Sequence, residues 1–171
     1  MGILRLLTER LELRPLPALA AAALPENRAE ASRALGVRLH AEWPHPDLVG
    51  LLLRQAAASA DTERFGIWVM IERNSGSVIG DIGFHGPPDD AGAIEIGYSV
   101  VPDRRRDGYA TEAANALIAW ALSQHGVRVI VAGCDPNNIA SIHTLERIGF
   151  RRSGEANGEL RWRYSSQPDP G

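Results

Sequence analysis

The sequence predicts a mixed α/β fold in which helices flank one sheet. Residues 65–165 hold short apolar or alternating runs bounded by turn residues, a pattern typical of strands. Residues 107–125 place small and apolar side chains at the spacing of one buried helix face. A strand precedes this helix and another follows it, which predicts a crossover between two parallel strands.

The first third of the chain predicts one strand followed by three helices, at residues 8–13, 18–24, 27–35 and 48–59. The strand alternates polar and apolar residues, and Pro15 is expected to end it. Asp47 is a favourable N-cap for the last of the three helices. Residues 38–46 fit no regular pattern and are expected to be irregular.

The remaining strands are expected at residues 65–71, 78–84, 93–101, 128–133, 150–155 and 160–165, with helices at 107–125 and 138–148. In the strand at 93–101, Glu95, Gly97 and Ser99 share the face opposite the apolar residues. We expect a single domain over residues 1–166 and a disordered tail over residues 167–171.

Composition narrows the possible functions. The chain has 171 residues and a net charge of −3, so no overall positive field favours nucleic acid or an anionic membrane. Its single cysteine, Cys134, allows no intrachain disulfide, which suits the cytoplasm. The five histidines form no metal-binding spacing, so we expect no metal site.

The turn before the long helix carries the strongest chemical signal. Arg104, Arg105 and Arg106 are followed by Gly108 and Ala110, and the helix then begins. Helix N-termini offer free N–H groups to anions, and small residues let a phosphate approach the backbone. The turn matches neither a P-loop nor Gly-x-Gly-x-x-Gly. An ordinary helix start with solvated arginines is the alternative.

Two stretches together resemble the GNAT superfamily of N-acetyltransferases. Residues 95–113 (EIGYSVVPDRRRDGYATEA) resemble its acetyl-CoA motif, and residues 138–150 (NIASIHTLERIGF) resemble the helix that follows. Both are most similar to the branch that contains ribosomal-protein N-terminal acetyltransferases. The resemblance implies a mostly antiparallel sheet of six to seven strands that contains one splayed parallel pair.

The resemblance also implies how acetyl-CoA binds. The pantetheine arm is expected along Tyr98, Ser99 and Val100, between the splayed strands. The pyrophosphate is expected on the turn formed by Arg105, Arg106, Asp107, Gly108, Tyr109, Ala110 and Thr111. Asn138 is expected to bind the pantetheine or to orient its loop, and a plain N-cap role is the alternative.

Catalysis requires an acceptor for an amine proton and a donor for the leaving thiolate. Glu95 is the candidate base, with an ordinary surface carboxylate as the alternative. Many members of the family carry a tyrosine acid at the position that Leu145 occupies. Ser141, one helical turn earlier, is the candidate replacement, although a packing or capping role would also explain it.

The acceptor is expected to be a primary amine, on either a protein N-terminus or a small molecule. Glu42 and Trp43, in the irregular segment, and His85 are the candidate acceptor-site residues. Because Leu145 replaces the usual acid, a non-catalytic CoA-binding or regulatory module is an alternative function. An unrelated binder of a phosphorylated metabolite is another. A homodimer is possible because dimers are common in the family.

Overall fold

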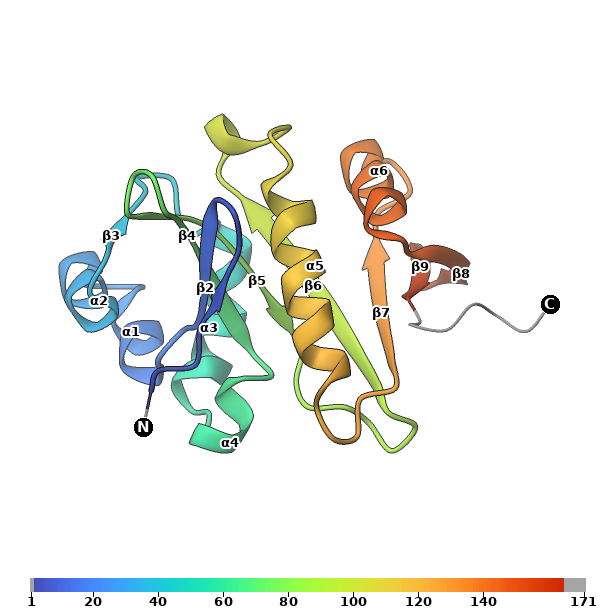
Figure 1. The fold of residues 1–171 in the computed structure, drawn as a ribbon, viewed down its shortest axis with the longest axis horizontal. Coiled ribbons are helices and arrows are strands. Elements are labelled where there is room, and N and C mark those ends of the chain that lie inside the picture. The colour runs from blue at the N-terminus through green and yellow to red at the C-terminus, as the bar shows by residue number, and fades with distance from the viewer. Residues whose placement is uncertain (1, 165–171) are drawn as a thin grey trace.

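The computed structural model describes residues 2–164, and its centre is one mixed sheet (Figure 1). The strands are β1 (Leu6–Leu7), β2 (Leu11–Pro15), β3 (Arg38–Leu39), β4 (Ile67–Glu72), β5 (Ser77–Phe84), β6 (Ala93–Val100), β7 (Val129–Cys134), β8 (Arg151–Ala156) and β9 (Glu159–Tyr164). Their spatial order is β1-β2-β4-β5-β6-β7-β9-β8, and β3 pairs with β5. The pairs β6–β7 and β3–β5 are parallel, and the others are antiparallel.

Helices lie on both sides of this sheet. They are α1 (Ala18–Ala23), α2 (Arg28–Leu35), α3 (Val49–Ala56), α4 (Ala60–Glu63), α5 (Tyr109–Leu122) and α6 (Ile139–Ile148), with 3-10 turns η1 (Pro46–Leu48) and η2 (Pro102–Arg104). In Figure 1, α5 crosses in front of the central strands, and α6 lies beside it above β7. Helix α1 packs on α2 and α3, and α3 packs on β4. The predicted mixed α/β fold with a parallel crossover is confirmed.

Aromatic contacts identify the face of the sheet that α5 covers. The ring of Trp120 on α5 lies 5.0 Å from that of Trp68 on β4 and 6.4 Å from that of Phe84 on β5. Trp68 is in register with Ile82, and Ile82 with Tyr98 on β6, so these side chains share the α5 face. Side chains of alternate parity point to the other face, toward the N-terminal helices.

Strands β6 and β7 pair over only part of their length. The paired residues are Ala93 with Val129, Ile94 with Ile130, and Glu95 with Val131. Beyond Glu95, β6 continues to Val100 and β7 continues to Cys134 without further pairing. Past this point, the facing backbone groups of β6 and β7 do not pair with one another. This is the separation expected of a splayed parallel pair.

The N-terminal strand prediction was wrong in its bounds. Residues 8–13 were expected to be one strand, but the chain turns at this point and forms the hairpin β1–β2. The Thr8 hydroxyl accepts a hydrogen bond from the Leu11 N–H at 3.0 Å, which closes the turn. This two-residue β1 and the two-residue β3 raise the number of strands within residues 2–164 to nine, above the expected six to seven.

The helix expected at residues 48–59 is also divided. His45, not Asp47, caps the first turn, because its Nδ1 accepts a hydrogen bond from the Asp47 N–H at 3.2 Å. Helix α3 ends at Ala56, and Ser59 starts α4 through a capping box with Thr62. Serine favours an N-cap over a helix interior, which explains the break. The tail expected at residues 167–171 lies outside the described residues.

Candidate active site

The turn between β6 and α5 exposes a row of backbone donors. Gly108, the N-cap of α5, has a φ of 82°, and Arg106 has a φ of 67°. Within the described chain, the backbone N–H groups from Arg106 through Thr111 have no hydrogen-bond acceptor. Unpaired donors at the N-terminus of a long helix form an anion-binding site.

The N-terminal hairpin fixes this turn from one side. Arg10 Nε lies 2.7 Å from Glu112 Oε2, and Arg10 Nη1 donates to the Asp107 carbonyl at 2.8 Å. The Arg10 guanidinium also lies 4.1 Å from the centre of the Tyr109 ring. Burial acts to raise the pKa of Glu112, but hydrogen bonds from Thr8 and Arg10 outweigh it and lower that pKa.

Glu72, at the end of β4, is a second residue that holds the turn between β6 and α5 in place. It accepts hydrogen bonds from the Tyr109 hydroxyl at 2.7 Å and from Arg104 Nε at 3.1 Å. Burial acts to raise the pKa of Glu72, but these hydrogen bonds and one from Ser75 lower it. The Tyr109 hydroxyl is thus bound to Glu72, while the backbone N–H of Tyr109 remains free at the helix start.

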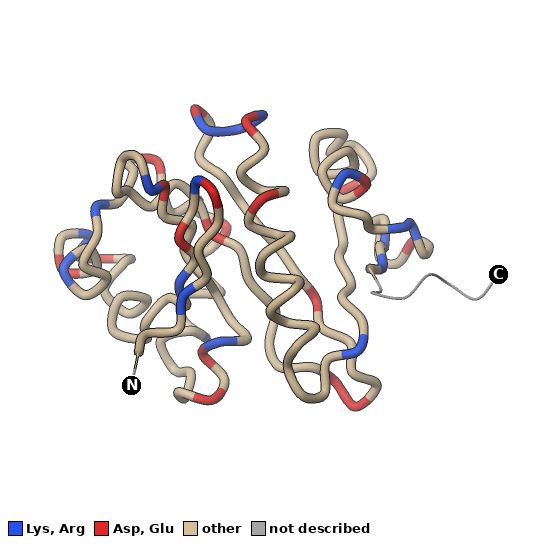
Figure 2. The backbone as a smooth tube through the Cα atoms, in the orientation of Figure 1, with Lys and Arg blue, Asp and Glu red and all other residues tan. Residues whose placement is uncertain are grey.

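The arginines of the turn have different roles. Arg104 pairs with Glu72 and with Asp103, and Arg105 Nε donates to the Val100 carbonyl at 2.9 Å. Arg106 forms no ion pair with any residue between 2 and 164, so its charge is available to an anion. Figure 2 shows basic and acidic residues side by side on the loop between β6 and α5.

The α6 helix places Ser141 beside the unpaired part of β6. The Tyr98 hydroxyl lies 3.3 Å from Ser141 Oγ, and burial raises the pKa of Tyr98. Asn138 caps α6 by accepting from the Ser141 N–H at 3.1 Å, as its capping alternative predicted. Leu145 is 1% exposed and belongs to the core.

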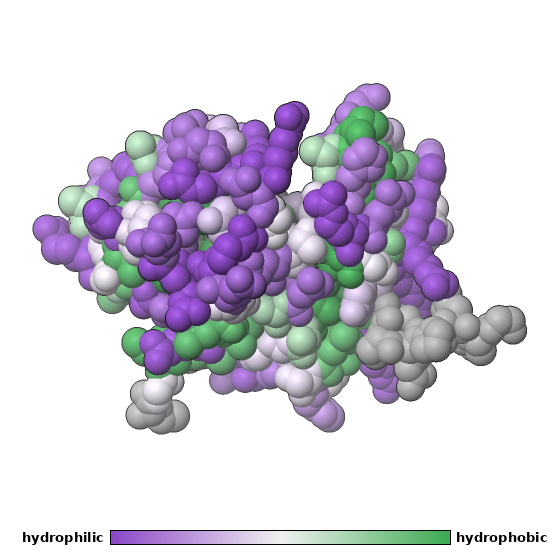
Figure 3. Space-filling view, turned by 45° about the horizontal axis from the view of Figure 1, so that its top comes forward, coloured by the Kyte–Doolittle hydropathy of each residue, from purple (hydrophilic) through white to green (hydrophobic). Residues whose placement is uncertain are grey.

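In the space-filling view, a notch separates the segment carrying α6 from the rest of the molecule (Figure 3).

Glu95 lies at the point where β6 and β7 stop pairing. Its Oε1 is 3.2 Å from Arg161 Nη1, and its Oε2 is 3.5 Å from His85 Nδ1. Glu95 and His85, which were predicted separately as base and acceptor-site residue, are therefore brought together. The carboxylate is partly exposed and has two cationic or potentially cationic neighbours, which holds it in one orientation.

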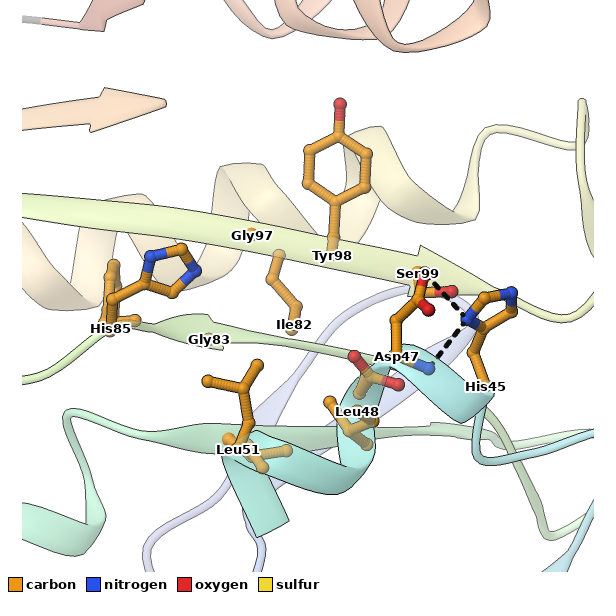
Figure 4. Close-up of a pocket in the computed structure, with 13 residues that line it drawn as sticks. His45, Asp47, Leu48, Leu51, Ile82, Gly83, His85, Gly97, Tyr98 and Ser99 are labelled. Atoms are coloured by element: carbon orange, nitrogen blue, oxygen red, sulfur yellow. Dashed lines mark hydrogen bonds and ion pairs between the residues drawn. The ribbon is translucent and has the colours of Figure 1, made fainter. Parts of the chain in front are cut away.

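A pocket of about 160 Å³ opens on the face of the sheet away from α5 (Figure 4). Leu48 and Leu51, from the N-terminal helical segment, form one apolar wall, and Ile67 on β4, which is in register with Gly83, adds to it. Its polar residues are His45, Asp47, Asp81, His85 and Ser99. Gly83 and Gly97 pair across β5 and β6, so the sheet presents little side-chain volume at this place.

Sequence reasoning placed Glu42 and Trp43 in the acceptor site, and neither lines this pocket. Glu42 is exposed, and its N–H donates to His40 Nδ1 at 3.1 Å. Trp43 is 2% exposed and donates from Nε1 to Asp81 Oδ2 at 2.8 Å. Trp43 therefore acts on the pocket through Asp81, which the sequence reasoning missed.

Asp81 is a buried carboxyl group in the wall of the pocket. It is 6% exposed, and burial raises its pKa to about 7 against the opposing hydrogen bond from Trp43. Its sequence context was a usable signal, because a charged residue interrupts the apolar strand between Ile79 and Ile82. Such a residue in a buried strand needs a partner or a function.

Two further predictions concern metal and membrane. Among residues 2–164, no group of three or more His, Cys, Asp or Glu side chains is placed to hold a metal ion. Cys134 is buried and accepts a hydrogen bond from Trp162 Nε1 at 3.3 Å. The helices of the described part are all too short or too polar to cross a bilayer.

The fold places free backbone donors at a helix start, beside two diverging parallel strands. The family model described as the acetyltransferase (GNAT) domain matches residues 10–151. The chain belongs to the GNAT family of N-acetyltransferases, and the resemblance found in its sequence is confirmed.

Individual relatives agree with the family. The uncharacterized N-acetyltransferase YjdG of Bacillus subtilis is 35% identical over 158 residues, which cover 91% of this chain and 93% of YjdG. The ribosomal-protein-S5-alanine acetyltransferase of Vibrio fischeri has a similar structure, with a TM-score of 0.66, 18% identity, and coverage of 95% of this chain and 96% of its own.

A third similar structure is that of the microcin C7 self-immunity acetyltransferase MccE, in complex with acetyl-CoA and AMP. Its TM-score is 0.65 at 18% identity, with 92% of this chain and 93% of that chain covered. At this identity the likeness concerns the fold alone.

The residues of this chain fit acetyl-CoA. The free N–H groups from Arg106 through Thr111 offer donors for a pyrophosphate. The unpaired edges of β6 and β7 offer backbone partners for the amides of a pantetheine arm.

Proposed function

We propose that this chain transfers an acetyl group from acetyl-CoA to a primary amine by direct attack in a ternary complex. The observation that carries the proposal is the row of unpaired N–H groups from Arg106 through Thr111, beside the separation of β6 and β7. Bound acetyl-CoA supplies an activated thioester, and every other requirement falls on residues of the chain.

The cofactor is held at two places. Gly108, Ala110 and the other residues of the turn bind the pyrophosphate through backbone donors, with charge from Arg106. Tyr98, Ser99 and Val100 border the pantetheine arm. The Val100 carbonyl already accepts from Arg105, so the partners of the arm come from the other backbone groups of this segment. Asn138 contributes its side-chain amide from the start of α6.

The acceptor enters from the pocket side of the sheet. Glu95 accepts a proton from the amine as the new C–N bond forms, and Arg161 keeps its carboxylate oriented. His85 lies between Glu95 and the pocket, which supports its assignment to the acceptor site. Glu42 remains a predicted acceptor contact at the exposed rim of the irregular segment.

Ser141 serves the leaving group. Its hydroxyl supplies the hydrogen bond to the departing sulfur and passes a proton to it, in place of the tyrosine that Leu145 replaces. The contact between Ser141 and Tyr98 supports this role, because the Tyr98 hydroxyl can return a proton to Ser141 after Ser141 has given its own to the sulfur. This mechanism applies equally to small-molecule amines and to protein N-termini as acetyl acceptors.

Two measurements test the proposal. Calorimetry with acetyl-CoA should show binding of one molecule per chain, and absence of binding at millimolar concentration contradicts the proposal. Incubation with acetyl-CoA and a panel of primary amines should release free thiol in an amine-dependent manner. Binding without any amine-dependent thiol release favours a CoA-binding module without turnover.

A further inference from the structure

The mechanism above uses no group from the centre of the pocket, yet the pocket contains a buried acid. Asp81 on β5 is in register with Ser99 on β6, so both side chains face away from α5. Asp81 is 6% exposed and accepts one hydrogen bond, from Trp43 Nε1. Within residues 2–164, no arginine, lysine or histidine forms an ion pair with it.

This arrangement is unfavourable in the free protein. A carboxylate removed from water without a cation costs free energy, and one hydrogen bond from an indole offsets it only in part. An asparagine would accept the same hydrogen bond from Trp43 without that cost. A ligand that brings a positive charge into the pocket would stabilise the buried Asp81 carboxylate, which the protein itself does not neutralise.

The dimensions of the pocket limit that ligand. Its volume of about 160 Å³ is close to that of a cavity that holds benzene, roughly 150 Å³. The apolar side chains of Leu48, Leu51 and Ile67 suit a short hydrocarbon body. A polypeptide N-terminus would have to lead its following residues out through the open side of the pocket, past the apolar side chains of Leu48 and Leu51.

We propose that Asp81 is the anchor for the ammonium group of a compact alkyl or arylalkyl primary amine, which is the acceptor of this enzyme. This inference rests on the proposed acetyltransferase function and names its substrate class. The ammonium group binds between Asp81 and Ser99, and the hydrocarbon body contacts Leu48 and Leu51. Trp43 orients the carboxylate from beneath.

The same pairing prepares the amine for attack. An ammonium ion has to lose one N–H proton before its nitrogen lone pair is free. Asp81 takes this proton, so that an O–H bond forms as the N–H bond breaks and the pair becomes neutral. Glu95 accepts the second proton when the C–N bond forms, so the two carboxylates have separate roles.

Calorimetry with 3-methylbutylamine tests the anchor without any acetyl transfer. The full chain, with and without saturating CoA, is titrated at pH 8 with this amine and with 3-methylbutanol, which has the same body but no charge. Asp81→Asn keeps the acceptor for Trp43 and should weaken amine binding at least tenfold, while binding of the alcohol is unchanged. Asp90→Asn, which removes the same charge from the exposed loop before β6, should bind both as the unmodified chain does.

Two further titrations do not depend on the folding of Asp81→Asn. In the unmodified chain, amine affinity should fall at least tenfold between pH 8 and pH 5.5, as Asp81 is protonated, while the alcohol affinity stays constant. His45, Asp47 and His85 also face the pocket; where Asp81→Asn folds, the same pH series in that variant separates their effect on the amine from that of Asp81. Leu51→Trp should fill the pocket and abolish binding of both compounds.

Equal amine affinity in the unmodified chain and in Asp81→Asn overturns the proposal. It is also overturned if the chain binds acetyl-CoA and acetylates an alanyl peptide but binds no compact amine. Failure of the acetyltransferase function is distinguishable, because it appears as absent acetyl-CoA binding or absent thiol release. Asp81-dependent amine binding would stand in that case.

Discussion

Arg10 and Glu112 join the N-terminal hairpin to the first turn of α5, with Arg10 Nε 2.7 Å from Glu112 Oε2. Glu112 also accepts hydrogen bonds from the Arg10 N–H at 2.7 Å and from the Thr8 hydroxyl at 2.6 Å. The β6–α5 turn is therefore held by a part of the chain that comes about a hundred residues earlier. Its shape depends on the hairpin as well as on its own glycine.

We expect Arg10→Ala to weaken CoA binding about tenfold, equivalent to about 1.4 kcal/mol. The substitution removes the contact with Glu112, the hydrogen bond to the Asp107 carbonyl and the packing on Tyr109. Calorimetric titration with CoA measures the effect. Arg5→Ala removes the same charge from an exposed residue and should leave the affinity unchanged. Equal losses in both variants would mean that only overall charge matters.

Gly108→Ala should destabilise the chain by about 1–2 kcal/mol and reduce CoA binding more than tenfold. A residue with a Cβ is strained at a φ of 82°, so the turn relaxes and its N–H groups no longer converge. Gly36→Ala is a matched control, because Gly36 has a φ of 71° and open space around it, away from the site. Thermal unfolding should show a similar loss in both, whereas calorimetry should show weaker CoA binding in Gly108→Ala alone.

Ser141→Ala should lower kcat about a hundredfold, within the range for general acid catalysis, with little change in the KM for acetyl-CoA. Tyr98→Phe should have a smaller effect, about tenfold, because its hydroxyl acts through Ser141. His143→Ala, an exposed change on the same helix, serves as the control. A normal kcat in Ser141→Ala would leave that residue with a structural role.

Glu95→Gln should lower kcat/KM about a hundredfold, because the proton acceptor is lost. The comparison variant is Glu159→Gln, since Glu159 also contacts Arg161, at 3.6 Å. If Glu95 serves only as the partner of Arg161, the two variants should have similar activity. A selective loss in Glu95→Gln supports the base.

Asp81→Asn should stabilise the chain at pH 8 and have little effect at pH 4. The pKa of Asp81 is raised from 3.8 to about 7 in the folded chain, so between these pH values the folded form binds the additional proton. Stability from this group is full below about pH 4 and is lost as the pH rises through 7. The advantage of the asparagine variant should grow by about 4 kcal/mol over this range.

Denaturant unfolding at several pH values measures that difference. Asp90→Asn provides the exposed reference and should show no such trend. A difference between Asp81→Asn and the unmodified chain that does not vary with pH would mean that Asp81 is ionised throughout.

The sequence was sufficient where the controlling interactions are local. Gly108 and Ala110 followed by a long apolar helix face predict a helix start with free N–H groups, because these donors belong to the turn itself. The capping alternative for Asn138 likewise followed from its place before α6, and its Oδ1 accepts from the Ser141 N–H. The positions of the main strands along the chain followed from alternation and turn residues.

The sequence was insufficient where partners are distant. Asp81 has its role through Trp43, which lies 38 residues away, and Tyr98 meets Ser141 across 43 residues. No periodicity carries such information, because it depends on which strands become neighbours. The short strands β1 and β3 were missed for the same reason, since two residues form a strand only when a partner lies beside them.

The partial pairing of β6 and β7 means that the chain consists of two pieces of sheet joined by three residue pairs, from Ala93–Val129 to Glu95–Val131. A molecule lying between the two strands would complete the hydrogen bonding of both edges, as an additional strand would. Binding of the cofactor would then also hold the two pieces of sheet together. Amide exchange in residues 132–134 and 98–100 should slow together when acetyl-CoA is added, and the two pieces should unfold as one.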